Sequence, residues 1–201
     1  MVKKKSNKVA SKRDSFQTPY YGTALILPYL VQHSNIWEPA AGLGFMARAM
    51  ADNGFNVFAT DIASAKYPKW DFLGDMKSEE WIRSVNYIIT NPPFSKKIAF
   101  YYRCMKYWNL YRIPFALLIP ADYAGWLIDA VRVDGCQKLI PNRRIDYITP
   151  TGKTAEGGHT SQFHSLWLVQ GLNIPDAAGH AILPTEVYVE LSLEEKLRIH
   201  G

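Results

Sequence analysis

Residues 87–94 of the chain read YIITNPPF, a short apolar run that stops at two consecutive prolines. The run Tyr87–Ile89 predicts a buried strand of a parallel sheet. Each proline fixes its own φ, removes a backbone donor and pushes the preceding residue toward extended geometry, so the end of this strand is stiff. Ligands bind just outside the carboxyl ends of the strands in an open α/β sheet. We therefore expect the functional site to lie at Asn91–Phe94.

The groups at this strand end suit methyl transfer to a planar amino nitrogen. The Asn91 side-chain oxygen and the Pro92 carbonyl are two acceptors that could hold both N–H groups of an exocyclic amine. Holding both hydrogens favours a pyramidal nitrogen, a geometry that is reached mainly in the transition state. Phe94 offers a flat face on which a base could stack. The alternative interpretation is that Asn91, Pro92, Pro93 and Phe94 form only a rigid turn that closes a strand.

A second stretch, residues 35–50, reads NIWEPAAGLGFMARAM. It predicts a strand that ends at Glu38, a glycine turn, and a helix from about Phe45 to Asn53. Gly54 is placed to end this helix as its C-terminal cap. The two glycines of the turn permit close approach of the backbone to a ligand, and the N-terminus of the helix would face that ligand.

The next predicted strand, Val57–Thr60, is followed by Asp61, which lies nineteen residues beyond Gly42. In nucleotide-binding βαβ units, an acid at about this spacing binds ribose hydroxyls. Residues 35–61 are therefore interpreted as half of a ligand-binding α/β sheet.

Two cofactors compete for the glycine turn. Residues Gly42–Ala47 satisfy the dinucleotide pattern G-x-G-x-x-G/A, which would imply NAD. Glu38 and Pro39 place a carboxylate at the strand end, which suits a cationic methionine-bearing ligand and poorly suits a pyrophosphate. S-adenosylmethionine carries no phosphate, and it is the cofactor that we expect. Asp71 could accept from an adenine amino group and Phe72 could line the ring; the alternative is a loop acid and a core aromatic.

Length and charge restrict the partners. With 201 residues and 48% apolar content, residues 16–201 are expected to form one domain. We find no apolar run near 18 residues and no signal peptide, which predicts a cytoplasmic protein without a membrane span.

Lys3–Arg13 contains six basic residues and no acid, which leaves 17 basic and 18 acidic residues in the rest. Residues 1–15 are expected to be a flexible basic tail that suits a nucleic-acid backbone; the alternative is a solubilising leader.

The later part of the chain predicts further elements. Ser95–Lys97 begins a helix, where Lys96 and Lys97 either meet a ligand phosphate or lie on a solvated surface. A buried strand follows at 115–120, and Asp122 is expected to cap the next helix. Residues 143–148 and 163–169 predict an antiparallel strand pair. We expect the loop 149–162 between them to cover the target base.

Metal and disulfide chemistry are not expected. Cys104 and Cys136 have no CxxC partner, which favours two reduced thiols. His159 and His164 lack a third ligand at metal spacing.

Together these pieces resemble the class I S-adenosylmethionine-dependent methyltransferases, in particular the amino-methyltransferases that act on nucleic acids. The matching pieces stand in the order of that family: Gln17-Thr18-Pro19, Glu38–Gly44, Thr60-Asp61-Ile62, Asp71-Phe72-Leu73 and Asn91–Phe94. They span residues 16 to about 120. The chain looks most like the small stand-alone adenine-N6 enzymes of the phage and bacterial kind.

The resemblance implies a Rossmann-like, doubly wound α/β sheet of about seven mostly parallel strands, with the last strand antiparallel. It implies cofactor contacts at Thr18, Pro19, Glu38, Pro39, Ala40, Gly42, Gly44, Asp61, Ile62, Asp71 and Phe72. It implies binding of the target amine at Asn91, Pro92, Pro93 and Phe94.

The expected function is methylation of the N6 amine of adenine, with DNA ahead of RNA as the substrate. In duplex substrate the base would be flipped out of the stack into the corner beside Phe94. Unlike the larger DNA enzymes, the chain leaves no room for a separate target-recognition domain after residue 170. An RNA target, a protein glutamine side chain and a non-catalytic nucleic-acid-binding subunit are the alternatives.

Overall fold

A central sheet of seven strands organises the computed structural model, which describes residues 14–74, 77–122, 124–149, 163–175 and 185–191. The strands are β1 (Asn35–Glu38), β2 (Asn56–Ala59), β3 (Tyr87–Thr90), β4 (Phe115–Pro120), β5 (Gln137–Pro141), β6 (Ser165–Gln170) and β7 (Glu186–Val189). Their order across the sheet is β2-β1-β3-β4-β6-β5-β7. The reversal of strand order between β1 and β3 is the position at which open α/β sheets bind ligands.

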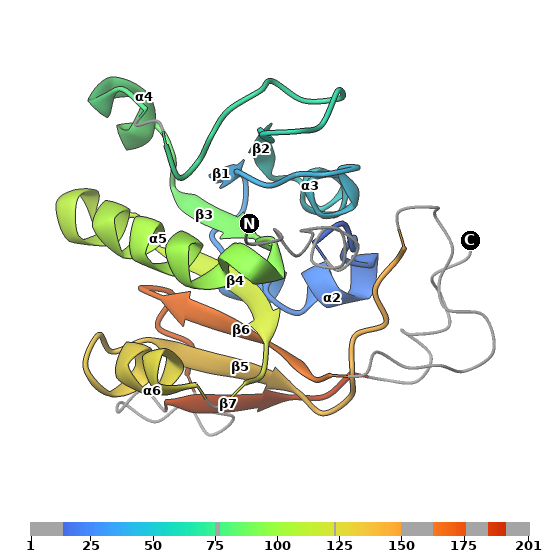
Figure 1. Ribbon diagram of the computed structural model, residues 1–201, viewed down its shortest axis with the longest axis vertical. Coiled ribbons are helices and arrows are strands. Elements are labelled where there is room, and N and C mark those ends of the chain that lie inside the picture. Colours follow the sequence, from blue (N-terminus) through green and yellow to red (C-terminus); the bar gives the residue numbers. More distant parts are fainter. Residues whose placement is uncertain (1–13, 75–76, 123, 150–162, 176–184, 192–201) are drawn as a thin grey trace, which may run out of the picture.

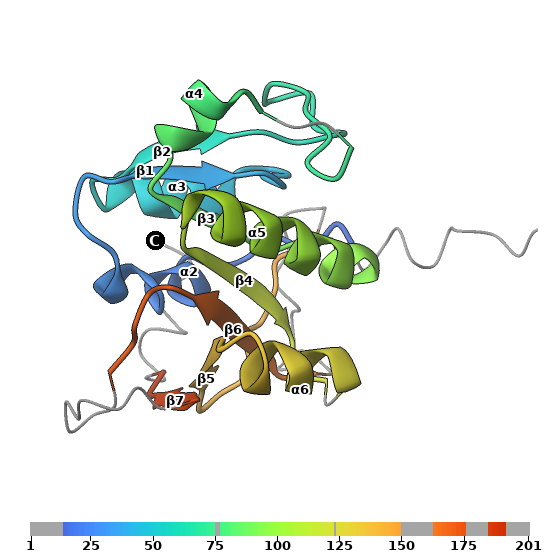
Figure 2. The same ribbon diagram turned by 90° about the vertical axis from the view of Figure 1, so that its left-hand side faces the viewer.

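Helices cover both faces of this sheet (Figures 1 and 2). The helical elements are α2 (Tyr20–Ala24), η1 (Leu27–Tyr29), α3 (Phe45–Asp52), α4 (Glu79–Arg83), η2 (Phe94–Lys96), α5 (Lys97–Tyr111) and α6 (Gly125–Arg132). Side chains of α2 and α3 share one buried cluster with Ile36 and Ile89. Side chains of α4, α5 and α6 share the other with Trp37 and Ile88. Successive strand residues therefore point into opposite cores, which is the doubly wound arrangement that the sequence predicts.

The strand directions confirm a mostly parallel sheet with one antiparallel strand. Strands β2, β1, β3 and β4 pair in parallel, β6 runs antiparallel to β4 and to β5, and β7 pairs in parallel with β5. The antiparallel strand is thus the sixth rather than the last. The reason is that β7 adds one more strand beyond β5 at the edge of the sheet.

The strand that pairs with β6 lies earlier than the sequence analysis places it. The prediction of a strand at 143–148 is wrong, because β5 runs from Gln137 to Pro141. Ile145 and Tyr147 are buried by packing in the cluster that contains α2 rather than by strand pairing. Ile148 makes only an isolated bridge with Gln17.

The structure confirms one predicted helix end and corrects one predicted cap. Gly54 follows α3 with φ +85°, as predicted. At the other helix starts, the Ser78 hydroxyl accepts the Trp81 N–H before α4, and Pro19 occupies the N-cap position of α2. Asp122 does not cap α6, because the N-cap residue of this helix is Ala124. The Asp122 carboxylate instead forms a salt bridge with Lys97 at 2.6 Å.

The basic residues 1–13, residues 150–162 of the predicted covering loop and residues 192–201 lie outside the described part of the chain. Within the described part, every helix is too short or too polar to cross a bilayer.

Candidate functional site

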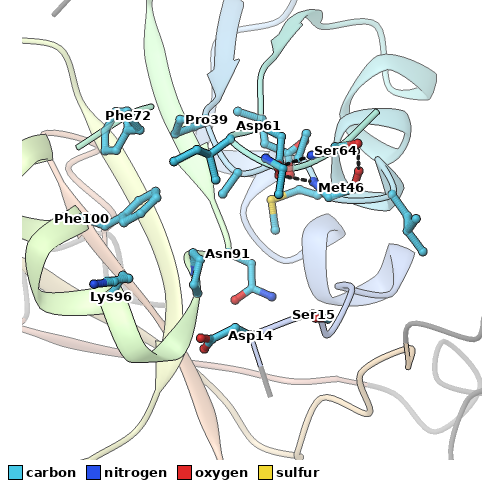
Figure 3. A pocket seen from close by; sticks show the side chains of 18 of the residues that line it. Asp14, Ser15, Pro39, Met46, Asp61, Ser64, Phe72, Asn91, Lys96 and Phe100 are labelled. Atoms are coloured by element: carbon cyan, nitrogen blue, oxygen red, sulfur yellow. Dashed lines mark hydrogen bonds between the residues drawn. The ribbon is translucent and has the colours of Figure 1, made fainter. Parts of the chain in front are cut away.

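A cavity of about 650 Å³ lies at the carboxyl ends of β1, β2 and β3 (Figure 3). Glu38 comes from the last position of β1, Asp61 follows β2, and Asn91 follows β3. The volume falls within the range of small-molecule binding pockets. The topology therefore brings Glu38 and Asn91, which lie 53 positions apart, to one cavity.

The glycine turn needs glycine at two positions. Gly42 and Gly44 have φ angles of +54° and +85°, in the left-handed region that side-chain-bearing residues avoid. A Cβ atom added at Gly44 would lie 1.8 Å from the Tyr67 hydroxyl oxygen. Gly44 is also the N-cap residue of α3, so the turn directs the N-terminus of this helix toward the cavity side of the sheet. The turn is consequently specified by backbone conformation and by close contact together.

Asp61 holds this turn in place. Its Oδ2 accepts the Gly42 N–H at 2.8 Å, and its Oδ1 accepts the N–H groups of Ala63 and Ser64 at 2.7 and 2.8 Å. The Ser64 hydroxyl in turn donates to the Gly42 carbonyl at 2.8 Å. A carboxylate oxygen has two acceptor sites, so Oδ2 can still accept from a ligand hydroxyl.

Glu38 is a buried acid with an unused acceptor. Its side chain is buried, and its Oε2 has no hydrogen-bond partner within the described residues. Burial, and after it the negative charge of Asp61, raise the pKa of Glu38 to about 8, although the Ala47 N–H at the start of α3 lowers it in part. A cation placed beside Oε2 would favour the ionised carboxylate. The site therefore fits a positively charged ligand better than an anionic one.

Only part of the predicted catalytic corner, Asn91–Phe94, lines the cavity. Asn91 and Pro93 line the cavity, and the Asn91 Oδ1 is buried without a hydrogen-bond partner in the described structure. Pro92 is buried and Phe94 half-buried, and neither is among the lining residues.

Phe94 belongs instead to an aromatic cluster beside the corner. Its ring meets Tyr147 and Phe163 edge-on, with centroids 5.8 and 5.3 Å apart. Tyr147 is fixed by a 2.7 Å hydrogen bond to the Ser165 hydroxyl. The ring of Phe94 therefore packs against other aromatic rings and does not line the cavity.

Aromatic residues line another part of the cavity. Phe72 is buried and packs against Phe100 with centroids 4.8 Å apart. Asp71 lines the cavity, and its Oδ1 accepts the Leu73 N–H at 3.0 Å. Trp70 also lines it, and its Nε1 is buried without a partner in the described region. Trp70 and Phe100 were not predicted, because a single aromatic residue carries no local signal of a ligand.

Most predicted cofactor residues meet at this cavity. The lining includes Thr18, Glu38, Pro39, Ala40, Gly42, Asp61, Ile62, Asp71 and Phe72. Pro19 and Gly44 do not line it. Of the two lysines, Lys96 lines the cavity, whereas Lys97 is paired with Asp122.

The N-terminal segment supplies a further wall of the cavity. Asp14, Ser15, Phe16 and Gln17 all line the cavity, and Figure 3 shows Asp14 on the same side of it as Asn91. Of these four residues, only Gln17 belongs to a stretch that carries the family resemblance, Gln17-Thr18-Pro19.

Within the described residues, the structure contains no group of three or more His, Cys, Asp or Glu side chains that could hold a metal ion. Cys104 and Cys136 are both buried free thiols.

No family model matches the sequence, and no curated protein matches it. Among solved structures, the chain is similar to PH1948 of Pyrococcus horikoshii, a candidate RNA methyltransferase, with a TM-score of 0.53 at 13% identity over 82% of this chain and 88% of that one. It is also similar to the type I restriction-modification methyltransferase subunit of Streptococcus thermophilus, with a TM-score of 0.57 at 11% identity over 90% of this chain. The chain spans about half of that subunit, 48% of its length. These likenesses show a Rossmann-like fold of the class I methyltransferase type.

Proposed function

We propose that the protein is an S-adenosylmethionine-dependent methyltransferase that methylates an amino nitrogen of a nucleic-acid base, with adenine N6 in DNA as the first choice. The observation that carries the proposal is the shared cavity: Glu38 and Gly42 open onto the same space as Asn91. A donor and an acceptor of a methyl group must meet within contact distance, and one cavity allows this.

The cofactor half of the cavity fits S-adenosylmethionine. This cofactor supplies an activated methyl group on a positively charged sulfur. Glu38 offers a buried, unpaired carboxylate oxygen to the cationic methionine part. The remaining Oδ2 acceptor site of Asp61 suits a ribose hydroxyl, and Asp71 with Phe72 suits the adenine ring. A pyrophosphate would meet two carboxylates at the same place, which disfavours NAD.

The other half of the cavity fits an amine. The Asn91 Oδ1 is a buried acceptor without a partner, and leaving such a group unpaired costs about 1–3 kcal/mol. An amine N–H from a substrate would satisfy it, and the Pro92 carbonyl is proposed to take the second N–H. Two bonds to the amine favour the pyramidal nitrogen that attacks a methyl group. Phe94, which lies outside the cavity lining, is proposed to stack on the target base.

The nucleic-acid substrate is supported by the neighbours and by charge. One similar structure is described as an RNA methyltransferase candidate and the other as a restriction-modification methyltransferase subunit. The six basic residues among residues 3–13 provide charge for a phosphate backbone, and Lys96 lines the cavity mouth. DNA stands ahead of RNA because the resembling motifs are those of the adenine-N6 DNA enzymes.

The test is transfer of a radiolabelled methyl group to duplex DNA, single-stranded DNA, RNA and protein, followed by digestion and identification of the methylated nucleoside. We expect N6-methyladenine from DNA. Asn91→Ala should abolish transfer while calorimetry shows unchanged cofactor affinity. Asn109→Ala, on the exposed side of α5, is the matched control. Transfer only to protein, or stabilisation by NAD and not by S-adenosylmethionine, would contradict the proposal.

A further inference from the structure

The N-terminal segment Asp14–Thr18 contacts both halves of the cavity. All five of its residues line the cavity. The segment is held at one end by the residue that follows the catalytic corner and at the other end by the glycine turn.

At the corner, one carboxylate makes two hydrogen bonds to one residue. The Asp14 Oδ1 accepts the Ser95 backbone N–H at 3.1 Å, and its Oδ2 accepts the Ser95 hydroxyl at 2.6 Å. Ser95 directly follows Phe94 and lies in η2. Asp14 therefore fixes both the backbone and the side chain at the far end of the corner.

At the glycine turn, Gln17 makes the corresponding contacts. Its Oε1 accepts the Leu43 N–H at 2.9 Å. Its amide lies so close to Gly42 that a Cβ atom there would be 2.6 Å from Nε2. Its own backbone is paired in both directions with Ile148, at 2.8 and 2.9 Å. Gln17 is consequently held through its backbone by Ile148 and through its side chain at the glycine turn.

The segment therefore has a fixed and short span. Asp14 and Gln17 are three residues apart, and three residues reach at most about 11 Å when fully extended. The Asn91 Oδ1 makes no hydrogen bond with a described residue, so side-chain bonding does not set its position. Its position is set by the backbone on either side, namely β3 before it and Ser95 after the two prolines.

We propose that Asp14 and Gln17 are positioning residues. Together they set the separation between the glycine turn and Asn91. This inference rests on the proposed function, since it assigns the methyl donor to the turn and the amine to Asn91. Neither residue touches the reacting atoms in this assignment. Each acts through a neighbour, Asp14 through Ser95 and Gln17 through Leu43.

The first measurement is steady-state methyl transfer at saturating cofactor. Asp14→Ala should lower kcat by about 10- to 100-fold, because displacement of a reacting group by about 1 Å costs a rate factor of this size. Cofactor affinity, measured by calorimetry, should stay within about twofold since Asp14 does not touch the turn. Asp14→Asn keeps an acceptor for the Ser95 N–H and should recover part of kcat. Asp129→Ala, on the exposed side of α6, is the control. An unchanged kcat in Asp14→Ala would overturn the inference.

The second measurement does not require turnover. In Asp14→Ala, amide hydrogen exchange at Ser95 should become faster, while exchange in β3 stays at the wild-type rate. Unchanged exchange at Ser95 would overturn the inference even if methyl transfer is found. If the wild type transfers no methyl group to any substrate, the proposed function is wrong, and the exchange at Ser95 still decides whether Asp14 holds the corner.

Discussion

Glu38→Gln is expected to stabilise the ligand-free protein at neutral pH. Burial, with the charge of Asp61, raises the pKa of Glu38 from 4.5 to about 8. The pKa of the folded state thus lies above that of the unfolded state. The stability of the wild type is therefore fully present below about pH 4.5 and is lost as the pH rises through about 8. Glutamine keeps the size and one acceptor oxygen of the side chain and removes its ionisation.

The size of the effect follows from the pKa difference. Each pH unit between the two pKa values costs the wild type about 1.4 kcal/mol relative to a group that does not ionise. From 4.5 to neutral pH this amounts to about 3 kcal/mol in favour of Glu38→Gln. Because Glu38 is buried, solvent screening does not reduce the figure.

The assay is urea denaturation of both proteins at a series of pH values between about 5 and 8. The free energy of unfolding of the variant should exceed that of the wild type by a margin that grows with pH. Glu80→Gln, at an exposed position of α4, should show no such growth. A margin that is constant with pH, or a variant less stable than the wild type at neutral pH, would refute the reasoning. The same variant should bind S-adenosylmethionine more weakly, since the carboxylate that favours a cation is gone.

Three further outcomes are expected. Gly44→Ala places a Cβ against Tyr67 at φ +85° and should cost about 1–3 kcal/mol of stability and weaken cofactor binding, measured by denaturation and calorimetry. Asp61→Asn replaces one acceptor oxygen by a donor, so at least one backbone N–H loses its partner; we expect a loss of about 1–3 kcal/mol in thermal denaturation. Burial raises the pKa of both thiols, that of Cys136 to about 12, so neither Cys104 nor Cys136 should react with a disulfide reagent until the protein is unfolded.

Each of these outcomes can fail in a specific way. Wild-type cofactor affinity in Gly44→Ala would show that the turn does not approach the ligand. Full stability of Asp61→Asn would show that its hydrogen bonds to the turn contribute nothing. Rapid labelling of one thiol in the native protein would contradict its burial.

The part of the cavity around the glycine turn was predictable because its signals are local. Glu38, the two glycines of the turn and Asp61 lie close together in the sequence, and each has a residue type that its backbone position or chemistry requires. Left-handed φ angles at Gly42 and Gly44 leave few alternatives to glycine. Local conformation and chemistry thus point to the same residues.

The other walls of the cavity were not predictable, because tertiary contacts determine which residues form them. Asp14 and Ser95 are 81 residues apart, and no local pattern marks such a pair. The apolar residues at 143–148 resemble a strand, yet they are buried in the cluster around α2. The shorter alternating run 137–141 forms the strand β5 that pairs with β6 instead. One partner of Phe94, Tyr147, comes from this misassigned region, so the orientation of Phe94 could not be foreseen.

The contacts of Gln17 also determine when the N-terminal wall of the cavity can be completed during synthesis. The residue docks on Leu43 and pairs with Ile148, which lies in the second half of the sequence. The backbone pairing of Gln17 can therefore form only after Ile148 has left the ribosome. The two residues are 131 positions apart, and long-range closure of this kind is slow compared with helix formation. The N-terminal wall of the cavity is therefore fully fixed only after β1 to β5 have been synthesised.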